Sequence, residues 1–340
     1  MEIKEMVLAK AKEAKEASRF IGNASTDLKN RIILKMAEYL KQKKDMLIKA
    51  NEVDVKNAEK KGLTKALIDR LTLTEKRIDE MVKGLEEIVS LPDPVGEITK
   101  MWLRPNGMLV GRMRVPIGVI GVIYEARPNV TVDVTGLCLK AGNSVVLRGG
   151  SEAINSNIAL VKILKEALKK EKMHEGAVSY IDIPMRETVL EMVKLEGLID
   201  LIIPRGGEGL IRTVTENSRI PVLKHYKGVC HVFVDKEADL SMAEEICFNA
   251  KVQRPATCNA METMLVDEAI AKKFLPKMLK RFEKAGVKIK GCPKTKELYP
   301  NVIDVTEEDF YKEYLDLILN VKVVKNIDEA IEHITKYGSA

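Results

Sequence analysis

Residues 118–150, GVIGVIYEARPNVTVDVTGLCLKAGNSVVLRGG, hold two short apolar runs, GVIGVIYEA and NSVVLRGG, on either side of a helix-like segment. The alternation continues through VSYIDI and LIDLIIPRGG, with helical patterns such as NSNIALVKILKEALKK between the apolar runs. Strands that alternate with helices over about thirty residues each indicate βαβ units and a parallel sheet. We therefore predict an α/β protein with a doubly wound, Rossmann-like sheet in this part of the chain.

The rest of the chain divides around that sheet. The first ninety or so residues show apolar positions at helical spacing and end at LPDPVG, and ITKMWLRPNGMLVGRMRVPIG has the Asn-Gly pair typical of a β-hairpin. After CHVFVD the alternation of strands and helices restarts, which predicts a second α/β domain. We expect residues 1–97 and 118–228 to form one domain, 98–117 a hairpin and 229–340 the second domain.

Composition excludes several classes of protein. With 46% hydrophobic and 31% charged residues the chain is typical of a soluble globular protein, and its net charge of +6 is a small excess of 56 basic over 50 acidic residues. The lysines alternate with Glu and apolar positions in helical segments, so we predict solvated helix faces and neither nucleic acid nor membrane as a partner. The charged N-terminus predicts no signal peptide.

Cysteine and histidine spacing gives no metal or disulfide pattern. The five cysteines form no CxxC pair and the four histidines no HExxH or HxH, so we expect no metal site and a reducing cytoplasm. Cys138 and Cys247 lie on apolar helical faces and are predicted to be core, and Cys230 and Cys292 are taken as incidental.

Cys258 stands apart because it lies in the turn-like run KVQRPATCNA. A cysteine without a reactive role is usually buried as a small apolar residue. The nearby charges of Lys251 and Arg254 would lower the pKa of a loop thiol, and its thiolate would attack a carbonyl carbon. A catalytic nucleophile and an inert loop cysteine are both compatible with this spacing.

Two strand ends suggest a dinucleotide. An apolar strand ends at Gly206 and Gly207 before a helix that begins near Glu208, where backbone N–H groups and the helix dipole favour an anion. A glycine turn required only for tight packing is the alternative.

Arg148 ends another strand, at a place where an acidic residue would bind a ribose hydroxyl. A guanidinium suits a 2′-phosphate instead, so Arg148 favours NADP(H) as the cofactor. An arginine that only marks a loop exit is the alternative here.

The segment YEARPNVTVDV places Asn129 at the start of an apolar helix, where we predict it as the N-cap. A side-chain amide at this place would also stabilise an oxyanion if it faced a nucleophile.

Eight collinear segments together resemble the γ-glutamyl phosphate reductase family of the aldehyde dehydrogenase superfamily. They are DRLTLTEKRIDEMVKGL, LPDPVGE, GRMRVPIGVIGVIYEARPNVTVD, VVLRGGSEAINSN, IPRGGEGLI, CHVFVDKEADL, QRPATCNAMET and EYLDLILNVKVV. The resemblance implies an aldehyde-dehydrogenase-like fold. Its parts would be an NADP-binding domain, an α/β catalytic domain and a protruding hairpin that builds a sheet with another subunit.

The resemblance also carries roles onto residues of this sequence. Cys258 matches the nucleophile and Asn129 the oxyanion-hole asparagine. His225 stands where hydrolytic relatives carry a general-base glutamate, and it either shuttles a proton or only packs. The remaining matches are the adenosine-side residues Arg148, Ser151 and Glu152, the pyrophosphate turn of Gly206 and Gly207, Glu313 at the nicotinamide ribose, and, by position only, Glu125 and Arg127 at the substrate.

The implied activity is NADPH-dependent reduction of L-glutamyl 5-phosphate to L-glutamate 5-semialdehyde in proline biosynthesis, through a Cys258 thioester and with release of phosphate. The implied partners are a second copy of the chain and a glutamate 5-kinase that hands over the labile acyl phosphate. The alternatives are an aldehyde dehydrogenase that acylates coenzyme A, or a cofactor-binding module without turnover, because family members continue beyond the YGSA at which this sequence stops.

Overall fold

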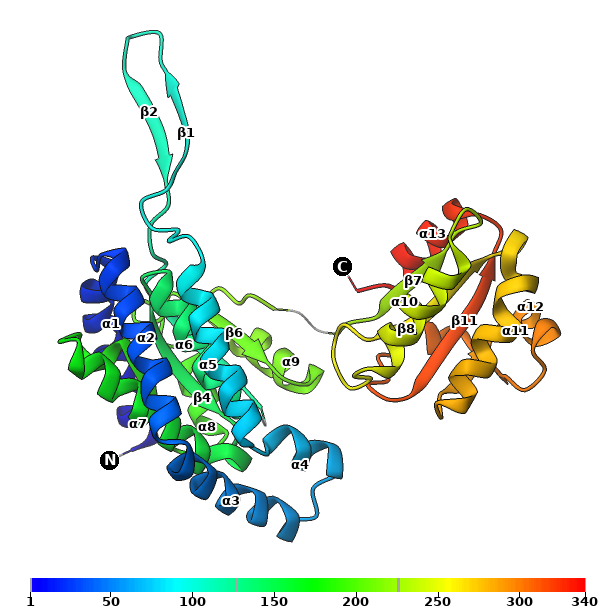
Figure 1. Ribbon diagram of the computed structural model, residues 1–340. Coiled ribbons are helices and arrows are strands. Elements are labelled where there is room, and N and C mark those ends of the chain that lie inside the picture. Colours follow the sequence, from blue (N-terminus) through cyan, green and yellow to red (C-terminus); the bar gives the residue numbers. More distant parts are fainter. Residues whose placement is uncertain (1, 126, 225–226, 340) are drawn as a thin grey trace. The chain divides into compact units, whose positions relative to one another are not determined.

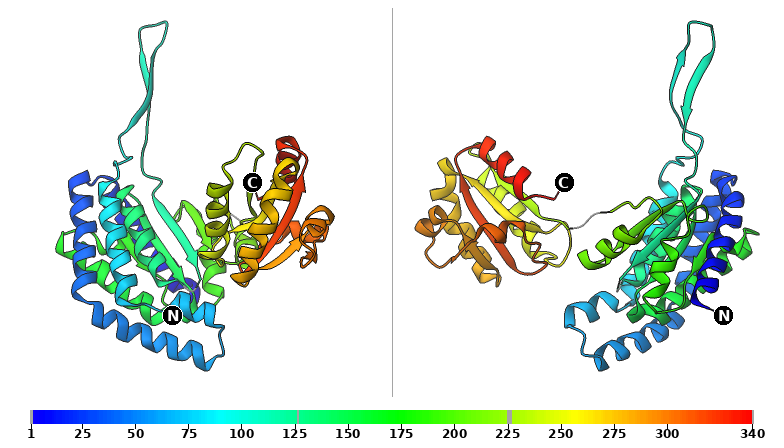
Figure 2. Two further views of the ribbon diagram at one scale, coloured as in Figure 1. Left: turned by 45° about the vertical axis from the view of Figure 1, so that its right-hand side comes forward. Right: turned by 180° about the vertical axis from the view of Figure 1, so that it is seen from behind.

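The computed structural model describes residues 2–125, 127–224 and 227–339. The chain divides into two compact units, Met1–Lys224 and His225–Ala340, each with its own sheet and core (Figures 1 and 2). We describe the two units separately.

Five helices open the first unit, as the apolar spacing predicts. They are α1 (Ile3–Gly22), α2 (Thr26–Gln42), α3 (Lys44–Lys60), α4 (Lys65–Leu71) and α5 (Glu75–Ser90). In α5 the buried residues Ile78, Met81, Val82, Leu85 and Ile88 recur at three- and four-residue spacing and form one apolar face. None of the helices that the structure describes is both long enough and apolar enough to cross a membrane.

The sheet of the first unit is parallel and has the order β5-β4-β3-β6. Its strands are β3 (Val119–Tyr124), β4 (Ser144–Gly149), β5 (Val178–Tyr180) and β6 (Leu201–Arg205), connected through α6 (Pro128–Lys140), η1 (Ser151–Ala153), α7 (Ile154–Lys170), η2 (Glu175–Ala177) and α8 (Glu187–Met192), and followed by α9 (Glu208–Asn217). Alternate residues of β3 enter two cores. Ile120, Val122 and Tyr124 pack with α2, α5, α6 and α7, and Val119 and Ile123 with α1, α8 and α9. The doubly wound α/β prediction is confirmed.

The hairpin that the Asn-Gly pair predicts is also present. Strands β1 (Ile98–Leu103) and β2 (Leu109–Met113) form a two-stranded antiparallel sheet that extends away from the rest of its unit (Figure 1). Gly107 has a φ of 83°, which glycine adopts without strain, and the Arg104 N–H donates to the Met108 carbonyl at 2.8 Å. The apolar side chains of this hairpin are exposed, with Leu103 at 70% and Leu109 at 60%.

The second unit has a parallel sheet with the order β10-β9-β11-β8-β7. Its elements are β7 (Cys230–Val234), α10 (Leu240–Val252), β8 (Met261–Asp267), α11 (Glu268–Lys284), β9 (Lys288–Gly291), α12 (Pro293–Leu298), β10 (Ile303–Asp304), η3 (Glu307–Tyr311), β11 (Ile318–Val324) and α13 (Ile327–Tyr337). The main core lies between the sheet and helices α10 and α11, and Ala330 of α13 packs in a separate cluster with Leu265 and Val324. The second α/β domain is therefore present.

Candidate active site

The candidate residues of the first unit gather where its strands end. Parallel strands bring their carboxyl ends to the same edge of a sheet. At this edge Glu125 follows β3 and Gly206 follows β6, and the Glu125 N–H donates to the Arg205 carbonyl at 3.2 Å. The structure thus brings the end of β3 and the glycine turn together.

The glycine turn binds an anionic oxygen. The Gly207 N–H donates to Oε2 of Glu125 at 3.0 Å, directly before helix α9, which begins at Glu208 as predicted. A Cβ atom added at Gly206 would lie 2.7 Å from the Glu125 carboxyl carbon and 2.8 Å from the Leu210 side chain, so a larger residue there would displace the ends of both side chains. A turn that already binds a carboxylate oxygen at a helix N-terminus suits an anionic group such as a pyrophosphate.

Arg148, in β4, is a buried cation whose acceptors are all neutral. Its side chain is 8% exposed and donates to the Thr188 hydroxyl at 3.3 Å and to the carbonyls of Gly149, Pro184 and Met185 at 3.1–3.2 Å. Burial lowers the pKa of this guanidinium, which still carries its charge at neutral pH. Since no hydrogen bond of Arg148 within the described residues reaches a carboxylate, its charge suits an added phosphate. The same bonds fasten the loop after β5, so the arginine also has a structural role.

Ser151 and Glu152 follow Arg148 closely in η1. Ser151 is exposed, and the Glu152 carboxyl group folds back so closely over Gly150 that a Cβ there would meet it at 2.1 Å. Both residues therefore lie just beyond the carboxyl end of β4, beside the Arg148 site.

The N-cap prediction for Asn129 is wrong. Arg127 is the N-cap of α6 and Pro128 the first helical residue, because proline at this place loses no hydrogen bond and has its φ already set for a helix. Asn129 lies in the first turn, and its amide donates to Oδ2 of Asp133 at 3.0 Å. Burial raises the pKa of Asp133, and the bond from Asn129 opposes that rise. Asp133 therefore fixes the orientation of the Asn129 amide.

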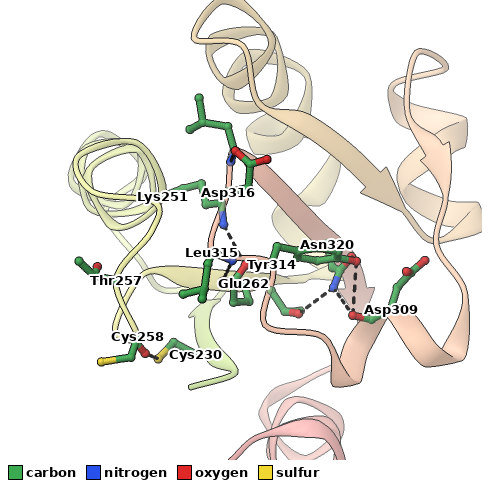
Figure 3. A network of polar contacts seen from close by, with 12 residues as sticks. Cys230, Lys251, Thr257, Cys258, Glu262, Asp309, Tyr314, Leu315, Asp316 and Asn320 are labelled. Atoms are coloured by element: carbon green, nitrogen blue, oxygen red, sulfur yellow. Dashed lines mark hydrogen bonds and ion pairs between the residues drawn. The ribbon is translucent and has the colours of Figure 1, made fainter. Parts of the chain in front are cut away.

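In the second unit, Cys258 lies in the irregular segment between α10 and β8. The Cys230 thiol, at the start of β7, donates to the Cys258 carbonyl at 3.3 Å, and the Cys258 sulfur points away from it (Figure 3). A Cβ at Gly228 would lie 2.0 Å from the same carbonyl oxygen, so the backbone of Gly228 passes directly against Cys258. Cys230 is therefore not incidental, although no spacing in the sequence indicates this contact.

The other thiols differ from Cys258 in their surroundings. Burial raises the pKa of both Cys138 and Cys247 to about 12, and both are core residues as predicted. Burial also raises the pKa of Cys230, and the charges of Cys258, Glu262 and Glu313 add to the rise. These three thiols stay protonated near neutral pH, whereas Cys258 is only half-buried.

Lys251 does not act on Cys258 as an unpaired charge, which corrects the sequence-based expectation. It is fully buried, and its ammonium group donates to Oε2 of Glu262 at 2.9 Å, so the carboxylate balances its charge. The other carboxylate oxygen of Glu262 accepts from the Leu315 N–H at 3.2 Å. Arg254 is exposed, and its carbonyl accepts from the Thr257 hydroxyl at 2.8 Å.

Glu313 lies in the same region, two residues before Leu315. Its charge raises the pKa of both Cys230 and Glu262. Within the described residues it is half-buried and has neither a hydrogen bond nor an ion pair. Of the remaining candidates, His225 lies outside the described residues.

The contact between Gly228 and Cys258 can be tested with two glycine variants. Gly228→Ala should lower the melting temperature and change the rate at which iodoacetamide alkylates Cys258, because the added methyl group must displace the Cys258 backbone. Gly209→Ala is the control, since a Cβ there meets nothing within 4 Å and alanine favours a helix. Calorimetry and peptide mass spectrometry provide both readouts. Equal behaviour of the two variants would show that the contact imposes no constraint.

Comparison with known proteins agrees with this geometry. Residues 3–314 match the aldehyde dehydrogenase family model. The chain is 85% identical over 340 residues to the γ-glutamyl phosphate reductase of Thermodesulfovibrio yellowstonii and covers 81% of it. It is also similar to the crystal structure of the γ-glutamyl phosphate reductase of Thermotoga maritima, with a TM-score of 0.92 and 51% identity over 98% of this chain and 80% of that one.

A likeness of fold alone extends further. An acetylating aldehyde dehydrogenase from Geobacillus thermoglucosidasius superposes with a TM-score of 0.69 at 18% identity, over 99% of this chain and 80% of that one. The predicted aldehyde-dehydrogenase-like fold is thus confirmed. The chain belongs to the aldehyde dehydrogenase family and, within it, to the γ-glutamyl phosphate reductases.

Proposed function

We propose that this protein reduces L-glutamyl 5-phosphate to L-glutamate 5-semialdehyde with NADPH and releases phosphate, a step of proline biosynthesis. The observation that carries the proposal is the 85% identity, over the whole of this chain, to a γ-glutamyl phosphate reductase. The site supports it, because Cys258 lies half-buried in a loop and Cys230, whose thiol donates to the Cys258 carbonyl, is within electrostatic reach of Glu313.

Cys258 is the nucleophile in this proposal. Its thiolate attacks the acyl carbon of the substrate, so a carbon–sulfur bond forms while the bond from that carbon to the phosphate oxygen breaks. The Cys258 N–H and the Asn129 amide, which Asp133 orients, stabilise the negative charge on the carbonyl oxygen. NADPH, when bound, supplies the hydride that converts the thioester to the aldehyde, and Cys258 leaves as a thiolate.

Several residues of the first unit would hold NADPH. The Gly206–Gly207 turn and helix α9 suit the pyrophosphate, and Arg148 with Ser151 suits the 2′-phosphate. Glu152 would border the adenosine side. The contact of Glu125 with the Gly207 N–H favours a place at the cofactor turn over one at the substrate.

The reacting end of the cofactor and the substrate would meet other groups. Glu313 would accept hydrogen bonds from the nicotinamide ribose, since its carboxylate has no partner among the described residues. Arg127 remains our candidate for the substrate carboxylate. At position 225 a histidine in place of a general-base glutamate would spare the thioester from hydrolysis, whether His225 shuttles a proton or only packs.

The reverse reaction tests this function. With L-glutamate 5-semialdehyde and NADP⁺, the protein should form NADPH over many turnovers only when inorganic phosphate is present, because phosphate must release the acyl group from Cys258; without phosphate the reaction should stop after about one NADPH per protein chain. Cys258→Ala should abolish turnover while it leaves the dissociation constant of NADPH nearly unchanged. Formation of NADPH with coenzyme A in place of phosphate would favour the acylating alternative, and substantial turnover by the alanine variant would exclude a Cys258 thioester.

A single substitution tests the preference for NADP(H). Arg148→Met keeps the apolar stem of the side chain and removes the guanidinium. We expect affinity for NADPH to fall by about 10- to 100-fold more than affinity for NADH, the size of a lost hydrogen bond to a charged group. Both affinities should also fall slightly, since the loop at Pro184 and Met185 loses its donor. Fluorescence titration measures both, and equal losses would mean that Arg148 is only structural.

The partners and location belong to the same proposal. The labile acyl phosphate favours direct transfer from a glutamate 5-kinase, and the five free cysteines suit a reducing cytoplasm.

The second copy of the chain would pair with the hairpin β1–β2. In its register Leu103 lies opposite Leu109 and Ile98 opposite Met113, and each of these four side chains is at least half exposed. A two-stranded sheet with this much exposed apolar surface is only marginally stable by itself in water.

Polar substitutions on the hairpin test that pairing. Leu103→Ser with Leu109→Ser should shift the protein from dimer to monomer, because both side chains are exposed and would become buried against the second copy. Arg281→Gln is the control, since this arginine pairs with Glu245 on the surface of the other unit. Sedimentation across a concentration series measures the change. A dimer unaffected by the two serines would show that the hairpin is not its basis.

A further inference from the structure

A completely buried ion pair flanks the Cys258 segment. Lys251 lies in the last turn of α10 and Glu262 is the second residue of β8, so the two residues stand on either side of the irregular segment that carries Cys258. Both side chains are 0% exposed, and the ammonium group lies 2.9 Å from Oε2 of Glu262 (Figure 3). Burial raises the pKa of Glu262, and the bonds from Lys251 and Leu315 oppose that rise.

The second oxygen of Glu262 holds a strained residue. Oε1 accepts from the Leu315 N–H at 3.2 Å, and Leu315 has a φ of 52°, in the left-handed region that a leucine rarely adopts. Its side chain is 38% exposed, so burial of that side chain does not hold the backbone there. Such a conformation persists only where the surroundings determine it. The bond to the Glu262 carboxylate is one interaction that holds the Leu315 backbone there.

The neighbouring residue is anchored separately. The Tyr314 hydroxyl donates to Oδ1 of Asn320 at 3.0 Å, and the fully buried Asn320 donates in turn to the Asp309 carbonyl at 2.9 Å (Figure 3). Two consecutive residues are thus fixed to the interior of the unit directly after Glu313. Glu313 itself makes no hydrogen bond within the described residues.

We propose that the Lys251–Glu262 pair is a positioning device for the reaction: it holds the Leu315 N–H and so sets where the Glu313 carboxylate stands relative to Cys258. The inference rests on the proposed function, in which Glu313 binds the nicotinamide ribose. A buried ion pair is rarely better for stability than an apolar pair of the same size. An apolar pair, however, would leave the Leu315 N–H without its acceptor. Lys251 balances the charge of this buried carboxylate, and the other carboxylate oxygen holds the Leu315 N–H.

Two double variants separate positioning from simple packing. Lys251→Met with Glu262→Gln removes both charges but keeps an oxygen acceptor for Leu315. Lys251→Met with Glu262→Met has nearly the same volume and lacks that acceptor. Both avoid a buried lysine without a counterion, which would destabilise the unit by itself. The two variants therefore differ in this acceptor and in the amide NH2 group that glutamine adds.

The readouts are the dissociation constant of NADPH, from fluorescence titration, and the single-turnover rate of semialdehyde oxidation. We expect the glutamine variant to stay within about threefold of the parent protein in both. The methionine variant should lose about tenfold or more in at least one, as for a lost hydrogen bond to a charged group. Equal losses in the two variants, or no loss in either, would overturn the proposal.

A double-mutant cycle with Glu313→Ala tests whether the effect passes through Glu313. In the Glu313→Ala background the loss of the acceptor should change neither readout further, because the effects of substitutions at residues that act through one another are not additive. Additive losses would overturn the proposal. Should the methionine variant fail to fold, Lys251→Met with Glu262→Leu replaces it in the same cycle, since it also lacks the acceptor for the Leu315 N–H.

The proposed function can fail separately from this inference. If the parent protein binds NADPH but does not oxidise the semialdehyde, the function is wrong. The NADPH titrations of the variants and of the cycle still decide the role of the ion pair.

Discussion

The geometry of parallel sheets determines where chemistry can occur in this protein. A parallel strand reaches its neighbour only through a crossover, so like ends of all strands in a sheet meet at one edge. Strands β3, β4 and β8 are buried along their whole length, which leaves those edges for polar groups. The first unit uses the carboxyl ends, where Arg148, Glu125 and the Gly206–Gly207 turn follow β4, β3 and β6. The second unit uses the amino ends, where Cys230, Cys258 and Leu315 stand at or before β7, β8 and β11.

The two edges differ in their electrostatics, and the difference matches the parts of the proposed reaction. At the edge of the first unit, the Gly207 N–H already binds a carboxylate oxygen. The same edge holds the buried guanidinium of Arg148, which donates to neutral oxygens. Both features favour a ligand with several negative charges. At the edge of the second unit Lys251 and Glu262 balance each other, and Glu313 keeps a carboxylate without a partner among the described residues. The carboxylate of Glu313 at that edge suits the hydroxyl groups of a ligand.

Sequence patterns predict the parts of this structure that depend on neighbours in the chain. Apolar periodicity gives α1 to α5 and both sheets, and Asn106-Gly107 gives the hairpin, because each signal acts over a few residues. The N-cap prediction fails at Asn129 because Pro128 takes the first helical position, so that Arg127 becomes the N-cap. This effect also acts over a few residues, but the sequence pattern shows it less clearly. The roles of Lys251 and Cys230 depend on side chains from other elements, Glu262 in β8 and the carbonyl of Cys258 beyond α10. Sequence spacing does not show such pairings, and a buried lysine looks like any other lysine until its partner is located.

Mass spectrometry of the intact and digested protein shows whether Cys258 carries the acyl group. The protein is mixed with L-glutamate 5-semialdehyde and NADP⁺ without phosphate, quenched in acid and digested. We expect a glutamyl adduct on the peptide that contains Cys258, formed together with NADPH and removed when phosphate is added before the quench. NADPH formation with no adduct on Cys258, or with the adduct on another cysteine, would contradict the proposed thioester at Cys258.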